Sequence, residues 1–196
     1  MTDSTLIVIS GPSGSGKGTV IRAVTAQVPE LSHTKTYTTR QPRPGEDSYV
    51  FVDEPEFERL LKEGRIAEHV RTYGSHAYGS PSELLEDSPP THVIVELDPF
   101  GMMGLRRRSK RRTTSVFLLP PSEQELRRRI RERGHVQDVE QRLEVAAEQI
   151  GMAWSYDFVV LNDQLRTTVE AVTTICRAEV LRSASRALLE REWPAG

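Results

Sequence analysis

The sequence has one cysteine, no long apolar run and no signal-like start. Because Cys176 is the single cysteine among 196 residues, no internal disulfide can form. No apolar stretch approaches the roughly 20 residues that a membrane-spanning helix needs, and residues 1–4 begin nothing like a signal peptide. We therefore expect a reduced, cytoplasmic protein that makes no contact with a membrane.

An excess of positive charge is also absent. The net charge of −2 and the pI near 6.2 argue against a dedicated nucleic-acid-binding protein. Two basic runs, at 106–112 and 127–133, are local, and we interpret the first as a solvated helix end rather than a site for an anionic partner. The length and the apolar content suffice for one hydrophobic core that carries insertions.

A glycine-rich loop follows the first apolar run. Residues 6–10 predict a strand, the sequence GPSGSGKGT comes next, and a helical pattern follows from Val20. Glycines let such a loop turn its N–H groups around an oligophosphate, the helix presents its positive end, and Lys17 reaches the β- and γ-phosphates. A nucleoside triphosphate site is therefore predicted at Gly11, Pro12, Ser13, Gly14, Ser15, Gly16, Lys17, Gly18 and Thr19.

Gly18 occupies the position after the lysine, where the strict phosphate-loop pattern has serine or threonine. Thr19 carries the nearest hydroxyl. Magnesium dehydrates reluctantly, so we expect the ion to be held largely through water and phosphate.

Four apolar runs predict the strands of a core sheet. They lie at 6–10, 92–97, 115–119 and 158–161, with helical patterns between or after them. Such alternation is typical of an α/β fold with a parallel sheet and helices on both faces. A final helix over about 164–190 is expected to pack Val169, Val172, Ile175, Val180 and Leu188 on this core.

Two insertions interrupt the alternation. Short strand patterns at 49–52 and 66–70 surround a helix pattern at 54–63, and a second helix, capped by Ser122 with Glu125 three residues on, follows Pro121. We expect a core made of 1–35, 89–120 and 143–196, an acceptor-binding subdomain at 36–88 and a helical lid at 121–142.

The first insertion carries residues suited to a second, phosphorylated substrate. Arg40 and Arg43 stand on a proline-stiffened turn, where two guanidinium forks can grip a phosphomonoester, and Tyr49 and Tyr78 can each donate a hydroxyl to it. Glu68 is a lone carboxylate in an apolar strand pattern, and Ser80 closes a turn at 78–80. A carboxylate accepts both N1–H and N2–H of guanine, whereas adenine would leave it unpaired, so Glu68 predicts guanine selectivity.

From Leu6 to about Arg182 the chain resembles the guanylate kinase family. Ten segments carry the resemblance in order and approximate spacing: GPSGSGKGT (11–19), TYTTRQPRPGE (36–46), YVFV (49–52), EFERLLKEGRIAEH (56–69), YGS (78–80), VIVELDPFG (93–101), LLPPS (118–122), RRIRERG (128–134), QRLEVAAEQ (141–149) and YDFVVLND (156–163). The resemblance implies a P-loop NTPase fold and transfer of the γ-phosphoryl group of ATP to GMP with Mg²⁺. It leaves dGMP as an acceptor and the oligomeric state open.

The resemblance also implies residue roles. Lys17 and the loop would bind the ATP phosphates, with Asn162 near adenine, and Thr19 and Asp98 would approach magnesium through water. The acceptor phosphate would be held by Arg40, Arg43, Tyr49 and Tyr78, and guanine would be read by Thr36, Glu68, Ser80 and Asp98. Glu96 and Asp98 form an acidic pair that would organise magnesium-bound water or contact the acceptor. The implied catalytic cations are Lys17, Arg40, Arg129, Arg133 and Arg142, the last three being lid arginines.

Some positions depart from the family pattern. The link between Arg43 and Tyr49 and the segment 134–142 are short, Thr36 replaces the usual serine, and Glu96 replaces the usual aspartate. A specialised or modified nucleotide, or another phosphorylated acceptor, therefore stays an alternative. A non-catalytic binding module is a second alternative, which the retained phosphate loop and Lys17 disfavour.

Overall fold

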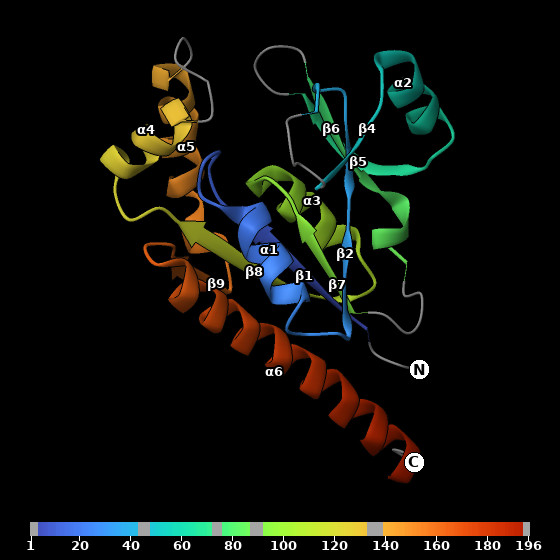
Figure 1. The fold of residues 1–196 in the computed structure, drawn as a ribbon. Coiled ribbons are helices and arrows are strands. Elements are labelled where there is room, and N and C mark those ends of the chain that lie inside the picture. Colours follow the sequence, from blue (N-terminus) through green and yellow to red (C-terminus); the bar gives the residue numbers. More distant parts are fainter. Residues whose placement is uncertain (1–3, 43–47, 72–75, 87–91, 133–138, 194–196) are drawn as a thin grey trace.

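A five-stranded parallel sheet forms the centre of the computed structural model (Figure 1). The structure describes residues 4–42, 48–71, 76–86, 92–132 and 139–193. From one edge to the other the strands are β2 (Leu31–Thr34), β7 (His92–Glu96), β1 (Thr5–Ser10), β8 (Arg112–Leu119) and β9 (Phe158–Leu161). The predicted parallel core is confirmed, and β2 is a strand that the sequence patterns did not indicate.

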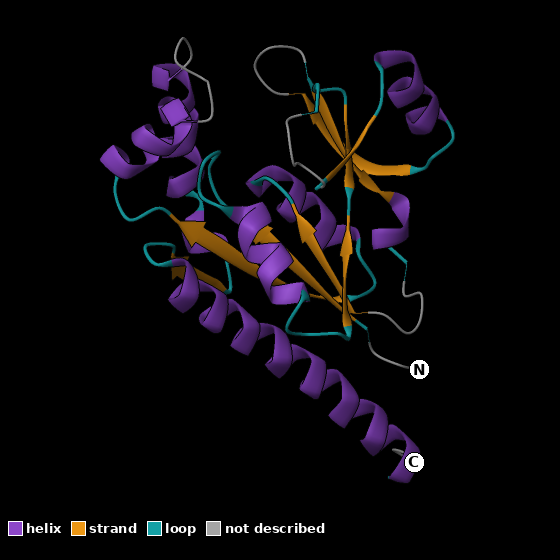
Figure 2. Cartoon of the chain, viewed as in Figure 1, coloured by secondary structure: helices purple, strands orange, loops and turns teal. Residues whose placement is uncertain are grey.

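Side chains of β1 alternate between two apolar layers, one on each face of the sheet. Ile7 and Ile9 pack with α1 (Lys17–Thr25) and α6 (Leu165–Glu192), whereas Leu6 and Val8 pack with α3 (Pro99–Arg108). All four side chains are completely buried, as expected for a central parallel strand. Helices therefore cover both faces of the sheet (Figure 2), as predicted.

A second sheet of four strands, the acceptor sheet, stands beside the core. Its strand order is β4 (Tyr49–Phe51), β3 (Thr36–Thr38), β6 (Ala77–Pro81) and β5 (Ile66–Arg71). Helix α2 (Glu54–Lys62) covers one face through a cluster that contains Phe57, Leu60, Ile66 and Ala77. Residues 78–80 belong to strand β6, so the prediction of a turn there is wrong.

Two helices, α4 (Glu123–Glu132) and α5 (Val139–Gly151), lie on the other side of the phosphate loop (Figure 1). They share a small apolar cluster of Leu126, Ile130, Val139, Leu143 and Ala146. The predicted cap is present, because the Glu125 N–H donates to Ser122 Oγ at 3.1 Å. Helix α5 runs without a break across position 142, where the predicted lid ends; the domain boundaries stay predictions.

The basic run at 106–112 is largely tied to other parts of the fold. Its bonds join Arg106 to Asp157, Arg108 to the Ala67 carbonyl, Arg111 to the Glu86 carbonyl and Arg112 to Glu179. Arg111 is only 8% exposed. The interpretation of the run as a solvated helix end is therefore wrong for Arg111, whereas Arg106, Arg108 and Arg112 are exposed to solvent and also make these contacts.

The last helix, α6, packs on the core through Val169, Val172, Ile175 and Val180, as predicted, but not over its last turns. Val169 and Val172 are buried, but Leu188 is 52% exposed, so the expectation that Leu188 packs on the core is wrong. A helix of 28 residues is about 42 Å long at 1.5 Å per residue, and its second half runs past the sheet (Figure 1). No helix in the described ranges has the length and apolarity to cross a membrane.

This difference along α6 predicts unequal effects of two substitutions. Val172→Ala should lower the free energy of unfolding by about 2 kcal/mol, because it removes buried methyl groups and leaves a cavity. Leu188→Ala should change it by less than about 0.5 kcal/mol. Urea unfolding followed by circular dichroism measures both, and equal effects would contradict the packing described for α6.

Candidate functional site

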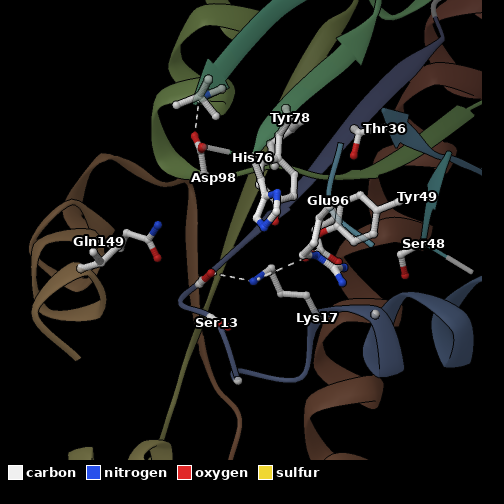
Figure 3. Close-up of a pocket in the computed structure, with 18 of the residues that line it drawn as sticks. Ser13, Lys17, Thr36, Ser48, Tyr49, His76, Tyr78, Glu96, Asp98 and Gln149 are labelled. Atoms are coloured by element: carbon white, nitrogen blue, oxygen red, sulfur yellow. Dashed lines mark hydrogen bonds and ion pairs between the residues drawn. The ribbon is translucent and has the colours of Figure 1, made fainter. Parts of the chain in front are cut away.

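A cavity of about 730 Å³ lies between the phosphate loop, the acceptor sheet and helix α5. Its walls come from segments far apart in the sequence (Figure 3). The predicted site residues that line it are Gly11, Ser13, Gly14, Gly16, Lys17, Gly18, Thr19, Thr36, Arg40, Tyr49, Glu68, Tyr78, Ser80, Glu96, Asp98 and Arg142. The fold therefore brings most of the predicted residues to one space.

The phosphate loop has a backbone that only glycine adopts readily. Gly11, Gly14 and Gly16 have φ values of 148°, 92° and 88°, in the region that L side chains disfavour. A Cβ on Gly11 would also lie 2.5 Å from the Leu118 carbonyl oxygen. The loop therefore carries no side chain at these three positions, where its backbone turns.

Asn162 supports this loop from within the fold. Its side chain is buried, and Nδ2 donates to the Ser15 carbonyl at 2.5 Å. A Cβ on Gly16 would lie 2.7 Å from the same Nδ2 atom. The amide group of Asn162 is therefore engaged with the loop, although the residue also lines a smaller cavity of about 280 Å³ on its far side.

The Lys17 ammonium is held at the mouth of the loop. It donates to the Gly11 carbonyl at 2.7 Å and the Pro12 carbonyl at 3.2 Å. Glu96 Oε1 lies 3.5 Å from Lys17 Nζ and accepts the Tyr49 hydroxyl at 2.9 Å. One carboxylate thus links the loop lysine to the acceptor sheet.

Strand alternation arranges the cavity-facing side of the acceptor sheet. Thr36 pairs with Tyr49, Thr38 with Tyr78 and Glu68 with Ser80. Successive side chains of a strand point to opposite faces, so alternate residues of each strand reach the same side. Six polar side chains of the acceptor sheet and its flanks line the cavity: Thr36, Arg40, Tyr49, Glu68, Tyr78 and Ser80.

Glu68 and Ser80 form a polar pair beside the start of α3. Ser80 Oγ donates to Glu68 Oε1 at 2.6 Å. A Cβ on Gly101 would lie 2.9 Å from that same oxygen, so a larger residue than glycine at position 101 would clash with the carboxylate. Burial raises the pKa of Glu68 above its usual range, against the opposing effect of the Ser80 hydrogen bond.

Asp98 caps helix α3. Its Oδ1 accepts the Gly101 N–H at 2.7 Å, the hydrogen bond expected of an N-cap residue. Burial raises the pKa of Asp98, although the backbone hydrogen bonds and the Lys17 charge act in the opposite direction. Asp98 therefore lines the cavity while serving as a structural acceptor.

Aromatic rings hold the Arg40 guanidinium. Its Cζ atom lies 5.5 Å from the centre of the Tyr49 ring and 5.7 Å from that of Phe51. The Tyr49 and Tyr78 rings meet edge to face at 5.8 Å. Stacking of this kind favours a cation and restricts its rotamers, so Arg40 is oriented before any ligand arrives.

The predicted lid arginines lie at different places. Arg142 lines the main cavity, and its Nε is buried with no hydrogen-bond partner among the described residues. Arg129 lines the smaller cavity, where it bonds to Glu125 at 2.7 Å and to the Asn162 carbonyl at 3.3 Å. Arg43 and Arg133 lie outside the described residues.

Several cavity residues were not predicted. Ser48, His76, Gln149 and Arg22 all line the cavity. Alternation along the strand that holds Tyr78 and Ser80 would have placed His76 on their face, but the sequence pattern indicated a turn there. Pro12 and Ser15, which were predicted, are buried and line neither cavity. Their carbonyls accept hydrogen bonds from Lys17 and Asn162, respectively.

The oxygen donors near Lys17 suit magnesium bound mainly through water. Thr19 and the two carboxylates of Glu96 and Asp98 line the cavity, and hard oxygen ligands are those that magnesium prefers. Asp98 is engaged in the helix cap, and Glu96 lies beside Lys17. No group of three or more Asp, Glu, His or Cys side chains that could hold a metal ion occurs in the described part of the chain.

The raised pKa of Glu68 predicts a pH-dependent stability difference. A folded-state pKa above the unfolded value means that the charged carboxylate opposes folding at neutral pH and that this cost disappears as the group is protonated at low pH. Glu68→Gln should therefore unfold at higher urea than the unaltered protein at pH 7, with a smaller gain at pH 4. The control is Glu144→Gln on α5, an exposed position. A gain that is equal at both pH values, or a loss at pH 7, would contradict the burial argument.

Comparison with known proteins agrees with this geometry. The model of the family described as guanylate kinase matches residues 3–179. A guanylate kinase of Wolbachia pipientis wMel is 34% identical over 188 residues, which cover 92% of this chain and 93% of the relative. One from Caldanaerobacter subterraneus subsp. tengcongensis is 38% identical over 186 residues, covering 90% of this chain and 88% of the relative.

Solved structures extend the comparison. The crystal structure of guanylate kinase from Anaplasma phagocytophilum superposes with a TM-score of 0.75 and 29% identity, over 100% of this chain and 98% of that chain. A gluconokinase from Sinorhizobium meliloti 1021 reaches a TM-score of 0.51 at 18% identity, over 96% and 98% of the two chains, and shares the fold alone. Sequence, fold and cavity together show that the chain belongs to the guanylate kinase family.

Proposed function

We propose that the protein transfers the γ-phosphoryl group of ATP to GMP, giving ADP and GDP, in the cavity described above. The observation that carries the proposal is the joining of two anion sites in that cavity: the phosphate loop with Lys17, and the acceptor sheet with Arg40. Family membership supplies the reaction class. The acceptor sheet supplies the reason for GMP.

Guanine is read at the Glu68 end of the acceptor sheet. The carboxylate accepts the N1–H and N2–H groups of the base, and Ser80, which bonds to Oε1 at 2.6 Å, keeps the carboxylate oriented. Thr36 and Asp98 line the same part of the cavity. An adenine there would place its N1 acceptor against the carboxylate, which leaves a half-buried charge unpaired. This argument also disfavours a sugar acceptor.

The acceptor phosphate is bound by Arg40, Tyr49 and Tyr78 in this proposal. These three side chains are close together, and their aromatic contacts are already formed. Arg43 is proposed as a further ligand from the sequence alone. A phosphate of GMP is itself the nucleophile, so the site needs no general base.

Transfer itself depends on positioning and on neutralisation of charge. Lys17 releases its loop carbonyls to bind the β- and γ-phosphates, and Arg142, whose Nε has no partner in the described residues, binds the transferred group. Arg129 and Asn162 are proposed to act on the ATP side, where both line the smaller cavity. Thr19, Glu96 and Asp98 would hold Mg²⁺ through water, and the ion would neutralise phosphate charge and help to position the donor for in-line attack.

An acceptor panel tests the proposed reaction. ADP formation from magnesium-ATP should be rapid with GMP and near background with AMP, CMP, UMP or no acceptor, because only guanine satisfies Glu68; the rate with dGMP decides whether a 2′-hydroxyl is required. In Arg40→Ala the KM for GMP should rise roughly ten- to a hundredfold, the value of one charge-assisted hydrogen bond. Arg59→Ala on α2, an arginine paired with Glu56 away from the cavity, is the matched control. No turnover with any nucleotide from a folded, ATP-binding protein would overturn GMP as the acceptor.

Arg142→Ala separates transfer from binding. Because this guanidinium is proposed to contact the transferred group, kcat should fall about a hundredfold or more, whereas the Kd for GMP should change little. Stopped assays give kcat and calorimetry gives the Kd. Arg131→Ala, which removes an exposed arginine of α4, should leave both unchanged. An unchanged kcat in Arg142→Ala would remove this residue from the mechanism.

A further inference from the structure

His76 is a titratable residue in the cavity with no role in the mechanism above. Of the histidines in the described residues, His76 alone lines the cavity. Its ring points into the cavity on the side of Tyr78 (Figure 3). Imidazole is the side chain that changes its charge between about pH 5 and 8, the range in which the second proton of a phosphate monoester also dissociates, at about pH 6.

The pairing of β3 with β6 brings His76 and Arg40 to the same end of this strand pair. Thr38 of β3 pairs with Tyr78 of β6. One step on, the Thr39 N–H donates to the Ala77 carbonyl at 3.1 Å, and the Ala77 N–H donates to Thr39 Oγ1 at 2.9 Å. Arg40 and His76 flank this Thr39–Ala77 contact, one just after β3 and the other just before β6. Both line the cavity, as Tyr78 does.

We propose that protonated His76 is a ligand of the acceptor phosphate, beside Arg40, so that the affinity for a nucleoside monophosphate rises as the pH falls. This inference rests on the proposed function, because it concerns the same acceptor site. An imidazolium carries two N–H donors and a full charge. Next to the Arg40 guanidinium, an imidazolium can donate to the oxygens of the same phosphate. Neutral imidazole, which has one donor and no charge, binds these oxygens less well.

Charged side chains of both signs line the cavity with His76. The cationic ones are Lys17, Arg22, Arg40 and Arg142, and the anionic ones are Glu68, Glu96, Asp98 and Glu132. Outside the lining, Glu54 of α2 lies close enough for the charge of His76 to act on it. The pKa of Glu54 is lowered chiefly by its hydrogen bond from Arg71, and more weakly by the charge of His76. Tyr49 and Tyr78 complete the titratable set. An incoming phosphate adds negative charge among these cations, so binding of GMP should be accompanied by uptake of a proton by His76.

Calorimetry with GMP and with guanosine tests the proposal, at several pH values from 6.0 to 8.5. At pH 6.0 His76→Asn should bind GMP roughly tenfold more weakly than the unaltered protein, and at pH 8.5 the two should bind almost equally. Guanosine, which has no phosphate, should bind both alike. Measured near pH 7 in buffers of different ionisation enthalpy, proton uptake on GMP binding should be smaller in the variant. The titration of GMP itself is common to both proteins and cancels in the comparison.

Two further variants sharpen the test. His69→Asn is the matched control, because His69 lies on the opposite face of the same sheet, where its ring contacts Phe57 at 6.4 Å. Its charge also acts on Glu68, so this control shows any pH effect that arises at the guanine end. His76→Lys keeps a positive charge throughout and should bind GMP tightly even at pH 8.5, which also shows that the position tolerates substitution.

The outcomes distinguish a failure of the role proposed for His76 from a failure of the proposed function. Parallel pH profiles of the unaltered protein and His76→Asn, or an equal loss of guanosine and GMP binding, would overturn the role of His76 while leaving the acceptor intact. A folded protein that neither binds GMP at any pH nor phosphorylates it would instead overturn the proposed function.

Discussion

Repulsion between two phosphate groups is the constraint on which the rest of the site depends. The transferred phosphoryl group and its acceptor both carry negative charge, and their repulsion strengthens in a cavity with less water than bulk solvent. Positive groups are therefore needed on both sides of the reacting atoms. In the proposed mechanism Lys17 and the glycine-rich loop provide them on the donor side, and Arg40 provides one on the acceptor side. Glu96 lies between Lys17 and Tyr49, with its carboxylate 3.5 Å from Lys17 Nζ.

Two carboxylates of the site are partly buried, although a charged carboxylate is more stable in water. Burial raises the pKa of both Glu68 and Asp98, so each charged group opposes folding at neutral pH. The fold offsets this with hydrogen bonds: Ser80 donates to Glu68, and the backbone N–H of Gly101 donates to Asp98. If Glu68 reads guanine as proposed, the site retains a cost in stability for the sake of base recognition.

The sequence predicted the core well because its strands are apolar runs with a helix after each. Strands β1, β7, β8 and β9 fall where the runs predicted them. It failed at β2, β3 and β6, which are short and polar and form through their partners rather than through their own propensity. Strand β6 contains Gly79 and Pro81, residues that usually break a strand. Glycine is required there, because a Cβ on Gly79 would lie 2.8 Å from Ile66 and 3.0 Å from the Phe57 ring.

The difference between local and long-range signals also explains which site residues could be predicted from the sequence. Lys17 and Arg40 belong to continuous motifs that carry their chemistry in local order. Ser48, His76 and Gln149 reach the cavity only because the acceptor sheet and α5 close around it, and no local pattern contains that information. The prediction that Leu188 is buried failed for a related reason. The apolar periodicity along α6 continues beyond the sheet that could cover it.

Helix α3 shows how structure and recognition are combined in one element. Its first turn contains Pro99 and Gly101, and glycine in a helix costs about 1 kcal/mol relative to alanine. The Asp98 cap contributes a similar amount in the opposite direction. With no Cβ at Gly101, the Glu68 carboxylate lies directly against this turn, where the positive end of the helix favours the charge that burial disfavours. At its other end α3 donates from Arg108 to the carbonyl of Ala67, the residue before Glu68. The carboxylate proposed to read guanine is therefore positioned by both ends of a helix that belongs to the core.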